Sequence, residues 1–298
     1  MTVDVENFSI PLNRCDPDTG REVYESGLPP LLDLLSKYDV RGTFYFTGEM
    51  AKMFPESVEL VLDGGHEIGC HGYDHSPEMA FDVLSYDKQV AELKKAKNVL
   101  ENIAGRIHSF RAPALRINEN TIKALKETGF NSDSSICSQR FDGPFTFGSR
   151  RKLKWLRAPR MPYFMSYDSI IRKGRTDILE IPISAFLVPY IGTTMRIFPG
   201  FIDILQKFIF FESRKTDKPV VFLFHPNECL SADRIITTRR GKNVFEHLFA
   251  DVLRQKMKLR NLGMVSLKLL ENSLKTAKNE GFDFISAGDY RQFFGRSQ

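Results

Sequence analysis

The stretch His66-Glu-Ile-Gly-Cys-His71-Gly-Tyr-Asp-His75 decides the fold, because it joins a short β-like run to a pair of histidines. His71 and His75 lie four residues apart, a spacing that lets both imidazoles reach one metal ion from a single turn or short helix. Taken alone, the pair is more typical of two surface histidines near a loop than of a metal site. The rest of the chain has to decide between these two interpretations.

Four further polar motifs follow apolar runs along the chain: Thr2-Val-Asp-Val-Glu6, Arg111-Ala-Pro113, Asp133-Ser-Ser135 and His225-Pro226. Each motif alone has a plain structural explanation, as a strand-end cap, a surface ion pair or a turn. In a parallel βα barrel, however, the carboxyl ends of all strands meet on one face, where active sites lie. Five motifs at successive strand ends therefore indicate one shared site.

Short apolar runs alternate with amphipathic helical patterns, which predicts βα units in an α/β protein. Strands are expected at 2–5, 42–46, 66–69, 107–110, 130–132, 178–183, 220–224 and 282–286. Helices are expected at 28–38, 49–63, 85–103, 118–128, 201–212 and, with a break near 261–263, 244–278. Residues 139–175 and 190–213 depart from the alternation, so we expect one domain over 1–298 with two excursions.

The composition is that of a soluble globular protein: 42% hydrophobic and 27% charged residues, a net charge of +5 and a pI near 8.9. No dense basic tract with interleaved aromatics occurs, so nucleic acid is not an expected partner. The four cysteines lack C-x-x-C spacing, which favours reduced thiols in the cytosol. The β-like run that starts at Thr2 leaves no room for a signal peptide, and we expect a cytoplasmic protein.

Together the five motifs resemble those of the polysaccharide deacetylase family, also called the NodB-homology domain or carbohydrate esterase family 4. The resemblance extends from Thr2–Glu6 to Leu223–Pro226. It implies a distorted (β/α)7 barrel and a hydrolase that removes acetyl groups from sugars with the help of a divalent metal.

The resemblance also implies a role for each motif residue. Asp4 matches the general base, which takes a proton from water, and His225 matches the general acid, which protonates the departing amine. His71 and His75 match the paired metal ligands. Further matches are Arg111, which holds the base ionised, and Asp133, which orients the acid histidine. Apart from the resemblance, the developing oxyanion needs a backbone N–H, and that of Ala114, directly after Pro113, is the natural candidate.

The first motif departs from the family pattern at Val5, where the family has a second, metal-binding aspartate. Alternate residues of a strand point the same way, so Asp4 and Glu6 share a face. We therefore expect Glu6 to replace the missing ligand. A site of Glu6, His71 and His75 suits zinc, and also nickel or cobalt. If Glu6 points away, two histidines alone would hold a metal weakly.

The leading functional expectation is an N-deacetylase for an amino sugar, on a cytoplasmic nucleotide- or lipid-linked precursor of a surface polysaccharide. The apolar 201–212 segment is typical of core packing, but it also suits peripheral contact with a membrane surface. The basic stretch around Lys154 suits a substrate diphosphate or simply a solvated loop. Two alternatives stay open: a deformylase or allantoinase-like cyclic amidase with the same site, and a catalytically inactive glycan-binding module.

Overall fold

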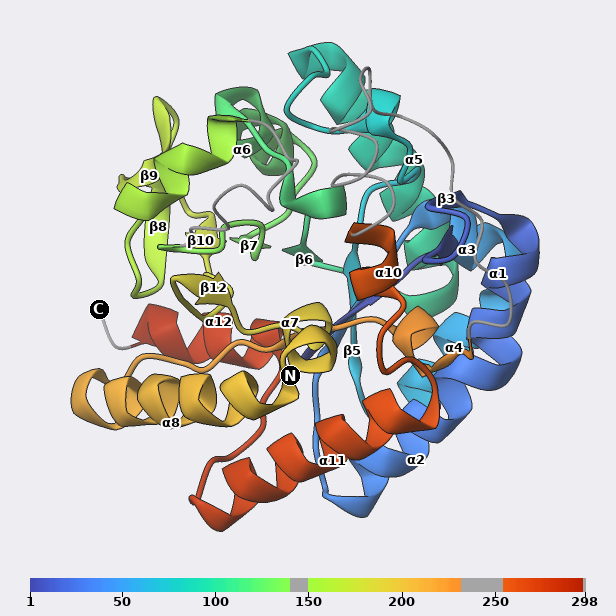
Figure 1. Ribbon diagram of the computed structural model, residues 1–298. Helices are drawn as coiled ribbons and strands as arrows, with labels where there is room; N and C mark the ends of the chain where they lie inside the picture. The colour runs from blue at the N-terminus through green and yellow to red at the C-terminus, as the bar shows by residue number, and fades with distance from the viewer. Residues whose placement is uncertain (140–149, 232–253, 297–298) are drawn as a thin grey trace, which may run out of the picture.

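The computed structural model describes residues 1–139, 150–231 and 254–296, and its centre is a mainly parallel sheet (Figure 1). The strand order is β13-β1-β4-β5-β6-β7-β10-β8-β9, and every pairing from β13 to β10 is parallel. The parallel strands are β1 (Thr2–Val5), β4 (Thr43–Phe46), β5 (Glu67–Cys70), β6 (Ser109–Phe110), β7 (Ser132–Asp133), β10 (Leu179–Glu180) and β13 (Leu223–Phe224).

The two edges of this parallel sheet approach each other, as in a barrel. The N–H of Ser184, beyond β10, donates to the carbonyl of Val221, before β13, at 3.0 Å. Ile191 also forms an isolated parallel bridge with Leu223. The predicted (β/α)7 barrel is confirmed in type. Its closure consists of these few bonds instead of a full ladder, which agrees with a distorted barrel.

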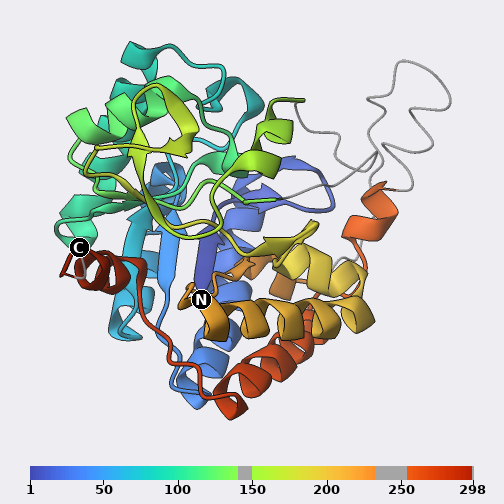
Figure 2. The ribbon, with the colours of Figure 1, turned by 90° about the vertical axis from the view of Figure 1, so that its left-hand side faces the viewer.

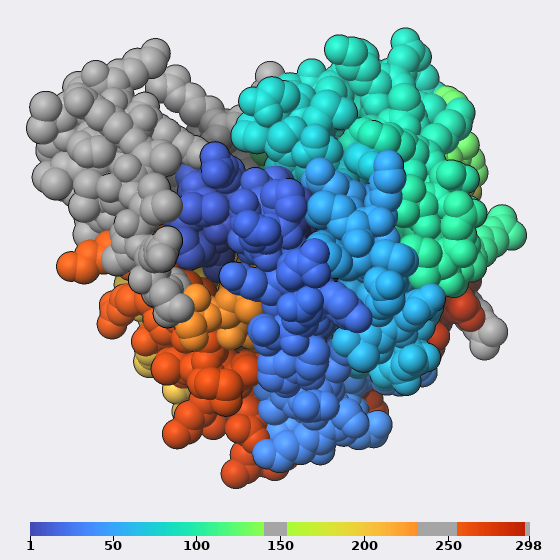
Figure 3. Space-filling view, turned by 90° about the vertical axis from the view of Figure 1, so that its right-hand side faces the viewer, coloured from blue at the N-terminus to red at the C-terminus, as the bar shows by residue number. Residues whose placement is uncertain are grey.

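Helices pack around the outside of the sheet (Figures 1 and 2). They are α1 (Pro17–Glu22), α2 (Leu28–Lys37), α3 (Gly48–Met53), α4 (Pro55–Asp63), α5 (Tyr86–Ala104), α6 (Glu119–Glu127), α7 (Gly192–Ile197), α8 (Pro199–Thr216), α10 (Arg254–Lys258), α11 (Met264–Asn279) and α12 (Ala287–Arg296). Helices α2 and α11 lie side by side, and Nζ of Lys37 contacts Oε1 of Glu271 at 2.5 Å (Figure 3). None of the helices in the described part of the chain is long and apolar enough to cross a bilayer.

Local sequence explains where the helices begin and end. Asn118 starts α6 with a capping box that Thr121 completes. The predicted 49–63 helix is wrong as one unit, because it breaks at Phe54, which has φ −136° and ψ 70° before Pro55. A residue that precedes proline is disfavoured in the helical region. Phe198 before Pro199 separates α7 from α8 in the same way.

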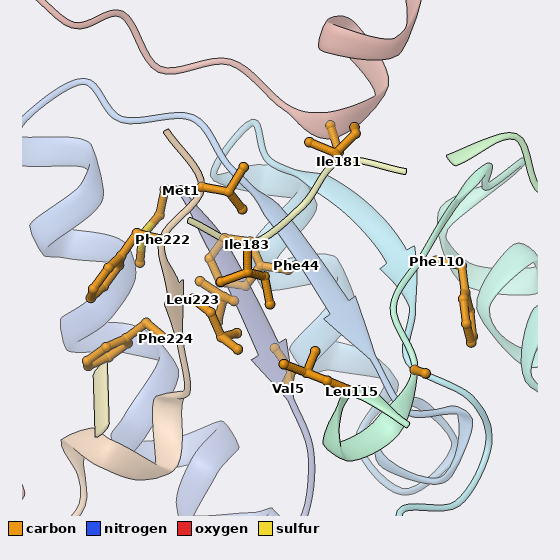
Figure 4. Close-up of a cluster of buried hydrophobic side chains, with 14 of the residues drawn as sticks. Met1, Val5, Phe44, Phe110, Leu115, Ile181, Ile183, Phe222, Leu223 and Phe224 are labelled. Carbon is orange, nitrogen blue, oxygen red and sulfur yellow. The ribbon is translucent and has the colours of Figure 1, made fainter. Parts of the chain in front are cut away.

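Side chains from distant strands form one continuous hydrophobic core. Figure 4 shows part of it, with Ile183 next to β10, Leu223 of β13, and Phe44 of β4 in the same cluster. The predicted strand at 282–286 is wrong, because these residues form no strand there, although Phe282 and Phe284 pack against the core.

Three hairpins escaped the sequence prediction. Strands β8 (Tyr163–Ser166) and β9 (Ser169–Lys173) extend the main sheet in antiparallel fashion, within the expected excursion. Two small sheets pair β2 (Phe8–Ser9) with β3 (Arg14–Cys15), and β11 (Ala185–Phe186) with β12 (Val188–Pro189). The first part of the predicted 244–278 helix and part of the 139–175 excursion lie outside the described residues.

Candidate active site

The predicted site residues converge at the carboxyl ends of the parallel strands. Asp4 is the third residue of β1, and Glu6 directly follows that strand. The imidazole of His71 follows β5, the guanidinium of Arg111 follows β6, and His225 follows β13. Their order in the sheet, with β1 between β13 and β4, brings residues that are far apart in sequence to one edge.

Glu6, His71 and His75 form a cluster whose possible ligand atoms all lie within 4.8 Å of one another. Oε2 of Glu6 is 3.5 Å from Nε2 of His71 and 2.8 Å from Nε2 of His75. That oxygen is buried and accepts no well-directed hydrogen bond. A buried oxygen facing two imidazole nitrogens suits a cation, and the donor set of one carboxylate and two imidazoles fits a divalent metal. The structure thus supports the position expected for Glu6.

The electrostatics of the cluster also favour a positive charge. Burial alone would raise the pKa of Glu6, but the imidazoles of His75 and His71 hold that pKa well below its usual range. Burial would lower the pKa of His75, yet Glu6 and the thiol of Cys15 raise it to about 10. The cluster is therefore a preformed place for a cation.

Hydrogen bonds from neighbouring groups orient the two histidines. The Nδ1–H of His71 donates to the carbonyl of Arg111 at 2.8 Å, which directs Nε2 at Glu6. The backbone N–H groups of Tyr73 and Asp74 both donate to Oε1 of Glu92, at 3.2 and 3.0 Å. The buried end of Glu92 thereby fixes the turn that carries both rings.

Arg111 clamps one oxygen of Asp4 and leaves the other free to react. Nη1 of the fully buried Arg111 donates to Oδ1 of Asp4 and to Oγ1 of Thr2, both at 2.9 Å, and its Nε and Nη2 donate to Ser134. The guanidinium also lies 4.5 Å from the centre of the Tyr45 ring. Oδ2 of Asp4 faces Nε2 of His71 at 3.7 Å and Nε2 of His225 at 3.9 Å. The expected pairing of Arg111 with Asp4 is present.

The partner expected for His225 is wrong. Asp133 does not orient the acid histidine, because Nδ1 of His225 lies 3.2 Å from Oε1 of Glu228. Glu228 is held in turn by Arg196, whose Nε donates to Oε2 at 2.9 Å. Burial lowers the pKa of His225, but Glu228, Glu6 and Asp4 raise it above its usual value overall. The signal that sequence reasoning missed was an acidic residue three positions after the histidine.

Asp133 instead faces a second buried carboxyl group. Strands β7 and β10 pair in register, so that Asp133 lies beside Glu180. Oδ1 of Asp133 accepts a hydrogen bond from Ser135, whereas Oδ2 of Asp133 and Oε2 of Glu180 have no other partner. Burial and the neighbouring carboxylate raise the pKa of Glu180 well above its usual range. One proton shared between the two groups explains the pair.

Ala114 lies in the short 3-10 turn Pro113–Leu115, directly after the arginine motif. Its φ is 51°, in the left-handed region that non-glycine residues seldom adopt. The turn is anchored, because Oγ of Ser135 accepts a hydrogen bond from the N–H of Ala112 at 2.9 Å. The oxyanion role of Ala114 stays a prediction.

Comparisons with known proteins give a family likeness over part of the chain. Residues 18–132, less than half of the chain, match the family model described as polysaccharide deacetylase. Over these residues the chain is similar to the polysaccharide deacetylase family. The match includes His71, His75 and Arg111, whereas Asp4, Glu6, Asp133 and His225 lie outside it, so their assignment depends on the geometry above.

Two relatives are named as deacetylases of peptidoglycan. A peptidoglycan deacetylase of Helicobacter pylori is 27% identical over 168 residues, which is 55% of this chain and 54% of the relative. A peptidoglycan-N-acetylglucosamine deacetylase of Bacillus cereus is 35% identical over 128 residues, 41% of this chain and 45% of the relative. The chain therefore spans about half the length of these relatives.

Solved structures support the fold. A Mycobacterium smegmatis protein assigned to the polysaccharide deacetylases superposes with a TM-score of 0.54 at 21% identity, over 93% of this chain and 90% of that one. PuuE allantoinase superposes with a TM-score of 0.57 at 16% identity, over 91% and 73% of the two chains. At these identities the likeness shows the (β/α)7 barrel type and no more.

Proposed function

We propose that this protein is a metal-dependent hydrolase that removes an N-acetyl group from an amino sugar. One observation carries the proposal: Oδ2 of Asp4 lies 3.7 Å from His71 Nε2, in the cation cluster, and 3.9 Å from His225 Nε2. A base thus lies between a cation site and a titratable imidazole. Amide hydrolysis requires these three functions side by side, because water must be activated and the leaving nitrogen must be protonated.

Glu6, His71 and His75 would hold the cation, which we propose to be zinc, with nickel or cobalt as substitutes. When bound, such a cation would polarise the acyl carbonyl and lower the pKa of a bound water towards about 7. The buried Oε2 of Glu6 supports this assignment, because it faces both imidazole nitrogens and accepts no well-directed hydrogen bond.

The chain's own residues supply the proton transfers. Asp4 takes a proton from the attacking water through Oδ2, because Arg111 occupies Oδ1. His225, in its protonated form, gives its proton to the amide nitrogen as the carbon–nitrogen bond breaks. The water oxygen stays on the acyl carbon, so the products are acetate and a free amine. The N–H of Ala114 is the proposed donor to the developing oxyanion.

We propose a nucleotide- or lipid-linked amino sugar in the cytoplasm as the substrate. A cavity of about 330 Å³ lies beside the Pro113–Leu115 turn, and Arg116, Asn118 and Lys154 are among its lining residues. Asp82 and Glu119 also line this cavity, and Arg116 pairs with Asp82 at 2.7 Å, so a phosphate-bearing group next to the sugar would compete with these carboxylates for the cationic side chains. Lys154 lies in the basic stretch expected to meet a diphosphate, and its Nζ is also 3.6 Å from Oε1 of Glu119. A lipid-linked substrate would bring the enzyme to a membrane surface.

The names of the relatives support a second candidate substrate, the peptidoglycan polymer. A panel distinguishes the two: purified protein supplied with zinc is offered N-acetylated sugar nucleotides, peptidoglycan fragments, N-formyl sugars and allantoin. We expect the wild type to release acetate from sugar nucleotides and D4N to release it about 10²-fold to 10⁴-fold more slowly. Turnover of peptidoglycan fragments alone would reject the precursor proposal, and ring opening of allantoin alone would reject N-deacetylation. No turnover of any substrate in zinc-loaded protein would favour a glycan-binding module.

A further inference from the structure

Helix α8 has two apolar faces, of which only one packs against the barrel. Its inner face buries Ile202, Leu205, Ile209 and Phe210. On its outer face, Phe201, Ile204, Phe208 and Phe211 are 42 to 63% exposed. These four positions are spaced by three, four and three residues, so they form one stripe along the helix.

The β11–β12 hairpin extends this stripe. Phe186 stacks on Phe208 with ring centres 5.4 Å apart and planes inclined by 10°. Leu187, at the hairpin turn, is 59% exposed and has a φ of 63°. Figures 1 and 2 show the hairpin beside α8 on the outside of the barrel. We call the six residues Phe186, Leu187, Phe201, Ile204, Phe208 and Phe211 the α8 stripe.

Basic side chains accompany the α8 stripe. Nζ of Lys215 lies 5.9 Å from the ring centre of Phe211, and Lys207 is exposed one position before Phe208. Glu212, the nearest acid, is neutralised by Arg160 and Lys218. Asp203 is exposed four residues before Lys207, so it offsets that lysine, and it lies about 120° around the helix from the centre of the stripe. Lys215, whose Nζ lies over Phe211, leaves positive charge next to the stripe.

We propose that the α8 stripe docks the protein on the surface of a membrane that contains anionic lipids. An interfacial helix combines a large apolar face with lysines that reach the headgroups, and α8 has both. A second copy of this chain is the competing occupant, and size-exclusion chromatography tests it below. The hairpin follows the carboxyl end of β10, the end of the sheet that carries the active site.

Vesicle flotation tests the proposal without any measurement of activity, so its outcome is independent of the proposed reaction. Full-length protein is mixed with vesicles of phosphatidylcholine, or of phosphatidylcholine with phosphatidylglycerol. We expect stronger retention on the anionic vesicles. The double variant F208S/F211S should lower that retention about tenfold or more, because each phenylalanine contributes through its buried apolar area. The variant K207E/K215E should abolish the preference for anionic lipid.

A matched control uses Met264 and Val265 at the start of α11, which are 75% and 51% exposed. M264S/V265S should float like the wild type. Equal retention of F208S/F211S and M264S/V265S would overturn the proposal, as would no retention of the wild type on either vesicle. A dimer in size-exclusion chromatography that F208S/F211S abolishes, without vesicle binding, would also overturn it and would assign the stripe to a second copy.

Discussion

At the scale of single residues, the site depends on which atom of each side chain is left available. Asp4 presents Oδ2 because Arg111 takes Oδ1, and His71 presents Nε2 because its Nδ1–H is bonded to a carbonyl. His225 is held by Glu228 in the same way, with Nε2 directed at Asp4. Each reacting atom is thus chosen by a hydrogen bond at the opposite end of its group.

The Glu228 carboxylate should set the basic limb of the pH–rate profile. His225 must be protonated to act as the acid, so activity falls as pH rises through its pKa. Burial lowers that pKa, and Glu228, Glu6 and Asp4 raise it above the usual value. E228Q removes one negative charge, so the basic limb of kcat/KM should move to lower pH by about one unit. The profile is measured on an N-acetyl amide substrate.

Two controls accompany this measurement. Glu212→Gln breaks another arginine–carboxylate pair and should leave the limb in place. The substitution removes the charged partner of the buried Arg196, which could destabilise the protein. Circular dichroism at the assay temperature therefore establishes whether E228Q is folded. A basic limb that does not move in folded E228Q would remove Glu228 from the role assigned to it.

At the scale of the elements, the register between short strands determines which reactive side chains become neighbours. Phe110 of β6 pairs with Asp133 of β7, and Asp133 pairs with Glu180 of β10. Two acidic residues are thus forced together by the backbone, and a shared proton makes this tolerable. The sequence shows Asp133 and Glu180 each at the end of an apolar stretch. The register that makes them neighbours is a property of the folded sheet.

The carboxyl pair predicts an unusual pH dependence of stability. Unfolded Glu180 loses its proton near its ordinary pKa, whereas folded Glu180 keeps it to much higher pH. Above the unfolded pKa the folded state therefore binds the extra proton, and stability decreases as pH rises towards the folded pKa. The E180Q side chain provides a permanent N–H donor for Asp133. Between pH 5 and pH 8 the free energy of unfolding of E180Q should therefore decrease less than that of the wild type. Denaturant titrations at several pH values measure this.

The conservative control is the substitution Glu67→Gln. Glu67 is also an acidic residue of a strand, and its carboxylate accepts hydrogen bonds from Ser109 and Thr43. It should follow the wild-type pH trend. If E180Q and the wild type lose stability in parallel as pH rises, the shared proton is not present.

At the scale of the whole molecule, local signals predicted much of the fold. The leucines of α2 and the prolines at its start predicted a buried helix, and Leu28, Leu31 and Leu35 are indeed fully buried. The five motifs predicted one site, and Asp4, Glu6, both ligand histidines, Arg111 and His225 do meet. Local periodicity predicts the helix because its pattern is set within one element. The shared site was predicted from the place of each motif at a strand end, since the carboxyl ends of parallel strands meet on one face.

Features set by distant pairing were not predictable from periodicity. The β8–β9 hairpin lies in a basic, irregular stretch, and its place in the sheet depends on contact with β10. The run 282–286 has strand composition but no neighbouring strand to pair with in the described structure, which shows that β propensity depends on context. Arg196, in α7, reaches Glu228 only through tertiary packing.

The central claim is that Glu6, His71 and His75 hold one divalent cation next to Asp4, the base. The most direct measurement is zinc content by mass spectrometry, with acetate release, for wild type, E6Q, H71A and D4N. We predict about one zinc per chain in wild type and D4N, and little in E6Q and H71A. Turnover should fall by about 10²-fold to 10⁴-fold in D4N. Full zinc content in E6Q, or wild-type turnover in D4N, would contradict the account.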